Sequence, residues 1–197
     1  MMINGMASLP KVQDSANTSV RAFLNQVTKD YGHMFDPRMK TAKGKKVSND
    51  DKKEWERVKK KFKGKCAYCA KKLDDKSTQK EHLKGLNREE CGLHHIGNIV
   101  PCCASCNKRE KVNGKSVDWK KQLKIICNNN QISKKEMKKR EREISNHMKQ
   151  HNLPKIPPAQ QKMIQKIAEN LYTQTKYVGE NMIKMWDDLK PDKLKSK

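Results

Sequence analysis

Four cysteines of this 197-residue chain are spaced as metal ligands. Cys66 and Cys69 belong to the segment CAYC, and Cys103 and Cys106 belong to CASC, with 33 residues between the two pairs. A C-x-x-C pair can place two thiolates on one side of a turn. Two pairs can therefore form a tetrahedral cage of four sulfurs, the arrangement that Zn²⁺ prefers. Such a cage has no open coordination position, so the spacing predicts a structural zinc ion.

The three other cysteines do not fit this pattern. Cys102 could join Cys106 only across three residues, whereas each predicted pair is separated by two. We expect Cys91, Cys102 and Cys127 to be small buried residues. The odd total of seven cysteines, four of them in C-x-x-C pairs, favours metal binding over disulfides and predicts an intracellular protein.

The residues between the two pairs include groups that a simple zinc ribbon does not need. Glu81 and His82 are adjacent, and Asn98 opens the run NIVPCCASCN, which ends at Asn107. With Gly92 in the intervening loop, this pattern resembles the HNH endonucleases of the ββα-metal class, in their zinc-bound four-cysteine subset. The resemblance covers roughly a quarter of the chain and implies a small ββα-metal core.

The resemblance also implies a role for each polar residue. His82, at the end of the first strand, is the general base that activates water. Glu81 and Asn107 bind one catalytic divalent cation, Mg²⁺ or Mn²⁺, at the scissile phosphate. Asn98 holds the loop and orients His82. His94, within that loop, contacts phosphate or steadies the site.

The chemistry of these residue types suits phosphodiester hydrolysis independently of the family resemblance. The reaction needs a base near neutral pH, which histidine supplies. It also needs a hard cation held by oxygen ligands such as a carboxylate and an amide. Because Asn107 directly follows Cys106, a zinc cage would fix the helix that presents it. His147 and His151 are also spaced as a metal pair, but with no third ligand evident we expect them on the surface.

The composition predicts a polyanionic partner. The net charge is +23, from 45 Lys and Arg against 22 Asp and Glu, and double-stranded DNA is the partner we expect. A membrane is not expected, because the basic stretches lack a matching apolar face and no apolar run approaches about 18 residues. The first residues have no basic segment followed by an apolar run, so we do not expect secretion.

Two helices are predicted before the cysteines. The first covers about residues 18–31, and a basic linker follows it. The second begins at Ser48 as N-cap, carries Trp55 and Val58 inward, and runs to about Phe62 before Gly64 stops it. The apolar face of the first helix consists of Val20, Phe23, Leu24 and Val27.

Three more helices are predicted after the cysteines. The first is amphipathic from Val117 to Cys127, and the second opens with a capping box of Ser133 and Glu136 and is very basic to about Gln150. The third covers about residues 159–189. Its apolar stripe either packs on the core or forms a homodimer through this C-terminal helix. The stripe consists of Ile164, Ile167, Leu171, Val178, Met182, Met185, Trp186 and Leu189.

These expectations combine into one architecture. We predict an α+β chain with an N-terminal helix and linker at 1–47, a nuclease domain with its leading helix at 48–117, and a basic helical extension at 118–197. Hydrophobic residues make up only 34% of the chain, so a zinc staple would supply stability that a large core cannot. The predicted function is metal-dependent DNA cleavage, with the basic helices contacting phosphate on either side of the cut. The alternative is a non-catalytic, zinc-stapled nucleic-acid-binding or assembly protein.

Overall fold

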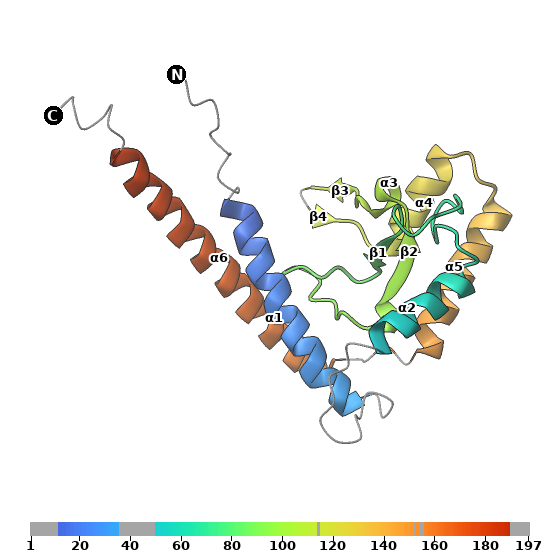
Figure 1. Cartoon of the computed structure of the whole chain (residues 1–197), viewed down its shortest axis with the longest axis horizontal. Coiled ribbons are helices and arrows are strands. Elements are labelled where there is room, and N and C mark those ends of the chain that lie inside the picture. Colours follow the sequence, from blue (N-terminus) through green and yellow to red (C-terminus); the bar gives the residue numbers. More distant parts are fainter. Residues whose placement is uncertain (1–11, 36–49, 114, 152, 154–155, 190–197) are drawn as a thin grey trace.

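The computed structural model describes residues 12–35, 50–113, 115–151, 153 and 156–189. Within them the chain is α+β, with helices around small antiparallel sheets, as predicted (Figure 1). The elements are α1 (Val12–Phe35), α2 (Asp50–Lys61), β1 (Gln79–His82), the 3-10 turn η3 (Ile96–Asn98), β2 (Ile99–Cys102), α3 (Ala104–Asn107), β3 (Lys111–Val112), β4 (Lys115–Ser116), α4 (Trp119–Asn129), α5 (Lys134–Gln150) and α6 (Pro158–Asp188).

The larger-scale arrangement has two parts, each with its own apolar core. Figure 1 shows α1 and α6 as a long helical pair on one side, and the sheets with α2, α4 and α5 on the other. The first core, around the cysteines, includes Cys66, Tyr68, Leu83, Val100, Leu123, Ile126 and Ile144. The second core, between the helices of the pair and the loop before η3, includes Val20, Leu24, Val27, Cys91, Leu93, Ile164 and Ala168.

The central sheet consists of β1 and β2. The strands are antiparallel, with Glu81 opposite Val100 and His82 opposite Ile99. All four residues of β2 are buried, whereas β1 buries Glu81 and leaves Gln79 and Lys80 exposed. Successive side chains of a strand point to opposite faces, so β1 presents different residues to its two sides. Helix α3 follows β2 directly.

Helix α1 is longer than predicted. Its apolar face is confirmed, because Val20 and Leu24 are buried at 2% and 0% exposure and pack against α6. The extra turns at its start are explained by packing: a Cβ on Gly179 of α6 would lie 2.7 Å from a Val12 methyl, so the Val12 side chain packs directly on the α6 backbone there. Tertiary contact of this kind stabilises helical turns that a local pattern does not predict.

The ends of the shorter helices follow the predicted signals in part. Gly64, at φ +62°, ends the α2 region, and Val58 is buried as expected. The predicted cap Ser48 and the basic linker lie outside the described residues. Helix α4 begins at Trp119, two residues after the predicted start, because the Asp118 carboxylate caps it by accepting from two backbone N–H groups.

Helix α5 begins with half of the predicted capping box. The Ser133 hydroxyl accepts from the backbone N–H of Glu136 at 3.3 Å, and the Glu136 carboxylate pairs with Arg140 instead of returning to the cap. The surface position expected for His147 is wrong, since its side chain is fully buried. It shares one helix face with Arg140 and Ile144, and this face packs on η3 and β2.

Helix α6 is apolar along its stripe, but the burial of that stripe decreases toward the C-terminal end. Ile164 is buried, whereas Val178, Met182 and Met185 are 54–66% exposed. Of the two alternatives, packing on the core therefore accounts for Ile164 but not for Val178, Met182 and Met185. Among the described residues, no helix is apolar over enough of its length to cross a membrane.

Candidate functional site

The first cysteine pair lies on a tight turn. Residues Lys65 and Lys72 form an antiparallel bridge at its base, and the Cys66 backbone N–H donates to Lys71 at 2.9 Å. Ala70 adopts φ +57°, which lets its N–H return to the Cys66 carbonyl and aims both thiols to one side. The turn is attached to the sheet because the Ala67 N–H donates to the Pro101 carbonyl at 2.8 Å.

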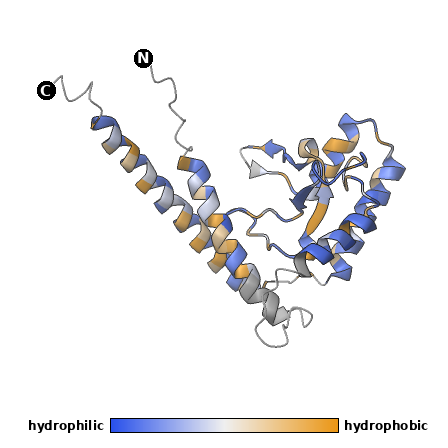
Figure 2. Ribbon diagram, in the orientation of Figure 1, coloured by the Kyte–Doolittle hydropathy of each residue, from blue (hydrophilic) through white to orange (hydrophobic). Residues whose placement is uncertain are grey.

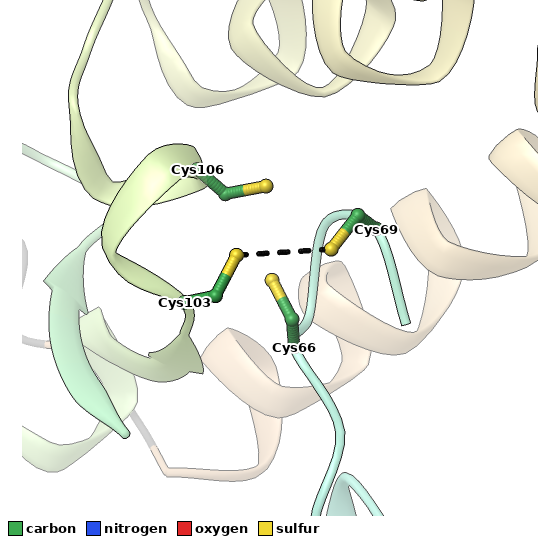
Figure 3. A group of neighbouring side chains, drawn as sticks. All are labelled: Cys66, Cys69, Cys103 and Cys106. Atoms are coloured by element: carbon green, nitrogen blue, oxygen red, sulfur yellow. Dashed lines mark hydrogen bonds between the residues drawn. The ribbon is translucent and has the colours of Figure 1, made fainter. Parts of the chain in front are cut away.

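The second pair lies at the start of α3. Cys103 is the N-cap of the helix, and its carbonyl accepts from the Asn107 N–H at 3.0 Å. The four thiols converge on one point (Figure 3), with all four sulfurs within 4.8 Å of one another and 3.8 Å between Cys69 and Cys103. A tetrahedron with Zn–S bonds of about 2.3 Å has S···S edges of about 3.8 Å. The predicted four-cysteine group is therefore confirmed, and it fits a zinc ion.

The three other cysteines are buried, as expected. Cys102 lies 3.8 Å from the Cys66 sulfur but is not a member of the four-thiol group. Cys91 and Cys127 have no exposed surface. Burial raises the pKa of the Cys91 thiol to about 11, so this thiol remains protonated and unreactive at neutral pH.

Glu81 is held by a residue that the sequence did not single out. Arg109 donates from Nε and Nη2 to the Glu81 Oε1 atom at 3.1 and 2.8 Å, and Tyr68 donates its hydroxyl to the same oxygen at 3.2 Å. Burial raises the pKa of the Glu81 carboxyl, and the guanidinium opposes that effect. Because these contacts use Oε1, a cation bound by Glu81 would be held through Oε2.

Arg109 also ties β1 to its surroundings. It donates to the carbonyls of His82, Leu83 and Val117, the last two at 2.9 and 3.0 Å, and lies 3.4 Å from the Glu90 carboxylate. It follows α3 directly, so the segment that leaves the four-cysteine group returns across the strand that carries Glu81 and His82. The signal that could have pointed to Arg109 is the Glu81 carboxylate, because a carboxylate that is buried in a strand needs a cationic partner nearby.

Asn107 reaches the same face of β1. Its Nδ2 donates to the Gln79 side-chain oxygen at 2.7 Å, and Gln79 lies two residues before Glu81 on the strand. A carboxylate and an amide oxygen are suitable donors for Mg²⁺. The chain thus brings the two predicted ligands to one side of the sheet, and cation binding itself stays a prediction.

His82 is half-buried at the end of β1. Its Nε2 lies 2.9 Å from Nδ1 of His94, and the two ring centroids are 5.1 Å apart. Burial, together with the neighbouring His94, lowers the pKa of His82 to about 4. The imidazole is therefore neutral at pH 7, the protonation state in which it can accept a proton.

Asn98 holds both ends of the loop between β1 and η3. Its Nδ2 donates to the carbonyls of Lys84 and Leu93 at 2.9 and 2.8 Å, and its Oδ1 accepts from the Lys84 N–H at 2.8 Å. The side chain is fully buried. Gly92 is required in this loop, because a Cβ there would lie 2.1 Å from the Lys84 carbonyl oxygen. That Asn98 thereby orients His82 stays a prediction.

The other histidines have structural contacts. His95 caps η3 by accepting from the Gly97 N–H at 3.1 Å. His147 Nε2 lies 3.0 Å from the carbonyls of Ile96 and Ile99, and its ring is 4.7 Å from that of His151. Within the described part of the chain, the four cysteines form the one group of three or more His, Cys, Asp or Glu side chains placed to hold a metal ion.

Comparisons with family models, with curated proteins and with solved structures found no match to this chain. The family resemblance therefore depends on the motif residues and their spacing.

Proposed function

We propose that the chain is a metal-dependent DNA endonuclease of the HNH type, with a ββα-metal core stapled by zinc. The observation that carries the proposal is the placement of His82. This neutral, half-buried imidazole is the last residue of β1 and directly follows Glu81. Asn107, presented by the helix of the second cysteine pair, reaches the same face as Glu81.

The proposed chemistry is hydrolysis of a phosphodiester. His82 accepts one proton of a water molecule as the water oxygen attacks phosphorus. The bond between phosphorus and the 3′ oxygen breaks, and this oxygen leaves with the bonding electrons and takes a proton from solvent water. The products are a 5′-phosphate and a 3′-hydroxyl. A divalent cation held by Glu81 and Asn107 would offset negative charge on the phosphate and on the leaving oxygen.

Basic helices support DNA as the substrate. Exposed lysines and arginines line α2 and α5, which are hydrophilic over most of their length (Figure 2). The helices meet at their C-terminal ends, where the Lys61 ammonium donates to the Gln150 side chain and the Phe62 ring contacts His147. We therefore propose that they contact backbone phosphate from one joint surface, which positions the duplex without reading its sequence.

A second candidate is a non-catalytic nucleic-acid-binding or assembly protein. The Glu81–Arg109 ion pair favours it, because the guanidinium already neutralises the carboxylate that would bind the cation. This candidate would keep the zinc group and the basic surface. It would bind DNA at fixed stoichiometry without turnover.

Cleavage of supercoiled plasmid distinguishes the two candidates. The zinc-loaded protein is assayed with Mg²⁺, with Mn²⁺ and with EDTA, beside His82→Ala and the matched control His151→Ala. The nuclease proposal expects nicked or linear product with either cation, none with EDTA, none from His82→Ala and normal product from the control. Binding without cleavage by all three proteins would favour the second candidate.

A further inference from the structure

We propose that Thr28 of α1 is a positioning residue for His82 and acts through His94, so that the α1–α6 pair is a working part of the active site. The proposal rests on the proposed function only in giving His82 a chemical role. The hydrogen-bond chain itself is a feature of the structure. It connects a helix outside the motif region to the strand that carries the base.

The first link joins α1 to the loop. The Thr28 hydroxyl oxygen accepts from the backbone N–H of His94 at 2.8 Å and donates to the Leu24 carbonyl, also at 2.8 Å. Thr28 is only 6% exposed. The Thr28 hydroxyl proton is donated within the helix. This donation fixes the orientation of the hydroxyl group, so its oxygen can accept from the His94 backbone N–H.

The second link joins the loop to β1. The His94 imidazole presents Nδ1 to Nε2 of His82 at 2.9 Å. One of these two nitrogens donates and the other accepts, so the contact couples the tautomer of one ring to that of the other. Moving the His94 backbone therefore changes the orientation of the His82 ring and the nitrogen that is free to accept a proton.

The residues before His94 are anchored from both parts of the molecule. Asn98, in the sheet region, holds the Leu93 carbonyl at 2.8 Å. The side chains of Cys91 and Leu93 are buried in the second core beside Leu24. The loop thus depends on the docking of α1, and Thr28 is the polar contact at that junction.

Helix α1 also forms one wall of a basic groove. Arg21 lies two helical turns before Thr28 and so shares its side of the helix. It lines a cavity of ≈ 270 Å³ together with Arg88 and Lys111, and Glu89 is the one acidic residue of that lining. A phosphate chain in this groove would meet α1 on one side and the core on the other, which is consistent with a helix that helps to arrange the site.

The test replaces the Thr28 hydroxyl without changing side-chain volume. Thr28→Val removes the acceptor, and Thr28→Ser retains it. Thr18→Val is the matched control, because the Thr18 hydroxyl donates to the Asp14 carbonyl at 2.8 Å on the same helix from an exposed position. The readouts are the imidazole ¹⁵N shifts of His82 at one fixed pH and, where cleavage occurs, kcat and KM.

We expect Thr28→Val to change the His82 ¹⁵N shifts and to lower kcat about 10- to 100-fold with KM within about twofold, because small displacements of a reacting group reduce rates strongly. Thr28→Ser and Thr18→Val should match the wild type. Unchanged His82 shifts in Thr28→Val would overturn the proposal, even if the wild type cleaves DNA. Changed shifts in a protein that does not cleave would support the positioning and contradict the nuclease function.

A second variant covers the case in which Thr28→Val does not fold. His94→Ala leaves the backbone N–H for Thr28 and removes the imidazole that meets His82. It should change the His82 shifts in the same way. A His82 spectrum identical to that of the wild type would overturn the proposal.

Discussion

The two parts of the molecule are stabilised by different means. One is the cysteine-containing part, which consists of the four-cysteine group, the sheets and helices α2, α4 and α5; the other is the α1–α6 pair. The pair buries apolar residues at helical spacing, and Thr28, at 6% exposure, is its one buried polar residue in the described chain. The cysteine-containing part has two four-residue strands, and it buries Glu81, Asn98 and His147 beside its apolar residues. A short sheet of this kind buries too little apolar surface, so metal ligands and polar contacts must hold it.

Removing the metal should give the largest difference between the two parts. Structural zinc sites contribute about 10 kcal/mol or more to folding. We expect Cys69→Ser, or treatment with a strong chelator, to unfold the β1–β2 region while most of the helical signal of α1 and α6 remains. Zinc content and far-UV circular dichroism measure this. Cys127→Ala, which alters a buried thiol outside the group, should retain one zinc per chain; equal loss in both variants would contradict the assignment of ligands.

Breaking the buried ion pair should give the next largest effect. Arg109→Met leaves the Glu81 carboxylate buried without its cation, which costs about 3–5 kcal/mol. Urea unfolding measures the loss. The double variant Glu81→Gln with Arg109→Met removes the uncompensated charge, so it should recover part of the stability. A single variant as stable as the wild type would show that Arg109 does not hold β1.

The dependence of stability on pH should distinguish the cysteine-containing part, because this part contains the buried His147. Burial lowers the pKa of His147 to about 4 from its ordinary value of about 6.5. As the pH falls through 6.5, the unfolded chain takes up a proton that the native chain does not accept until about pH 4. Stability should therefore fall over that interval, by at most about 3 kcal/mol from this residue.

The variant His147→Gln isolates this contribution. It can still donate to the Ile96 and Ile99 carbonyls but does not titrate. Zinc release at low pH affects both proteins, so the difference between their unfolding free energies reports the imidazole. The same dependence on pH in both proteins would contradict a buried, neutral His147.

Substitutions in the exposed C-terminal end of α6 should have the smallest effect on the free energy of unfolding. Val178, Met182, Met185 and Leu189 follow a 4-3-4 spacing, which is that of a coiled-coil seam, and each is more than half exposed. We propose that this seam pairs with a second copy of the chain. Met182→Glu with Met185→Glu should halve the mass measured by light scattering and change unfolding by less than about 0.5 kcal/mol per site. A monomeric wild type would contradict the proposal.

Sequence reasoning succeeded where a pattern is local. The spacing of Cys66, Cys69, Cys103 and Cys106 predicted the thiol group, and the apolar period predicted the buried face of α1. In both cases the residues that matter are a few positions apart within each segment. Their geometry is therefore fixed by a turn or by the helical repeat.

Sequence reasoning failed where the decisive contact is between distant segments. Arg109 is one of 45 Lys and Arg, and only the return of the chain across β1 distinguishes it. His147 belongs to a very basic helix, and its burial depends on which face meets η3. The pairing of α1 with α6 joins the two ends of the chain, and local patterns leave such a choice open (Figure 1).

The most direct test of the central claim separates binding from chemistry at His82. Single-turnover cleavage and DNA affinity are measured for zinc-loaded wild type and His82→Ala with Mg²⁺ and with Mn²⁺. We predict equal zinc content, affinities within about twofold, and cleavage at least about 100-fold slower in the variant, since a general base contributes about 10²–10⁴. Equal cleavage rates would remove His82 from the mechanism, and DNA binding without cleavage by either protein would contradict the nuclease.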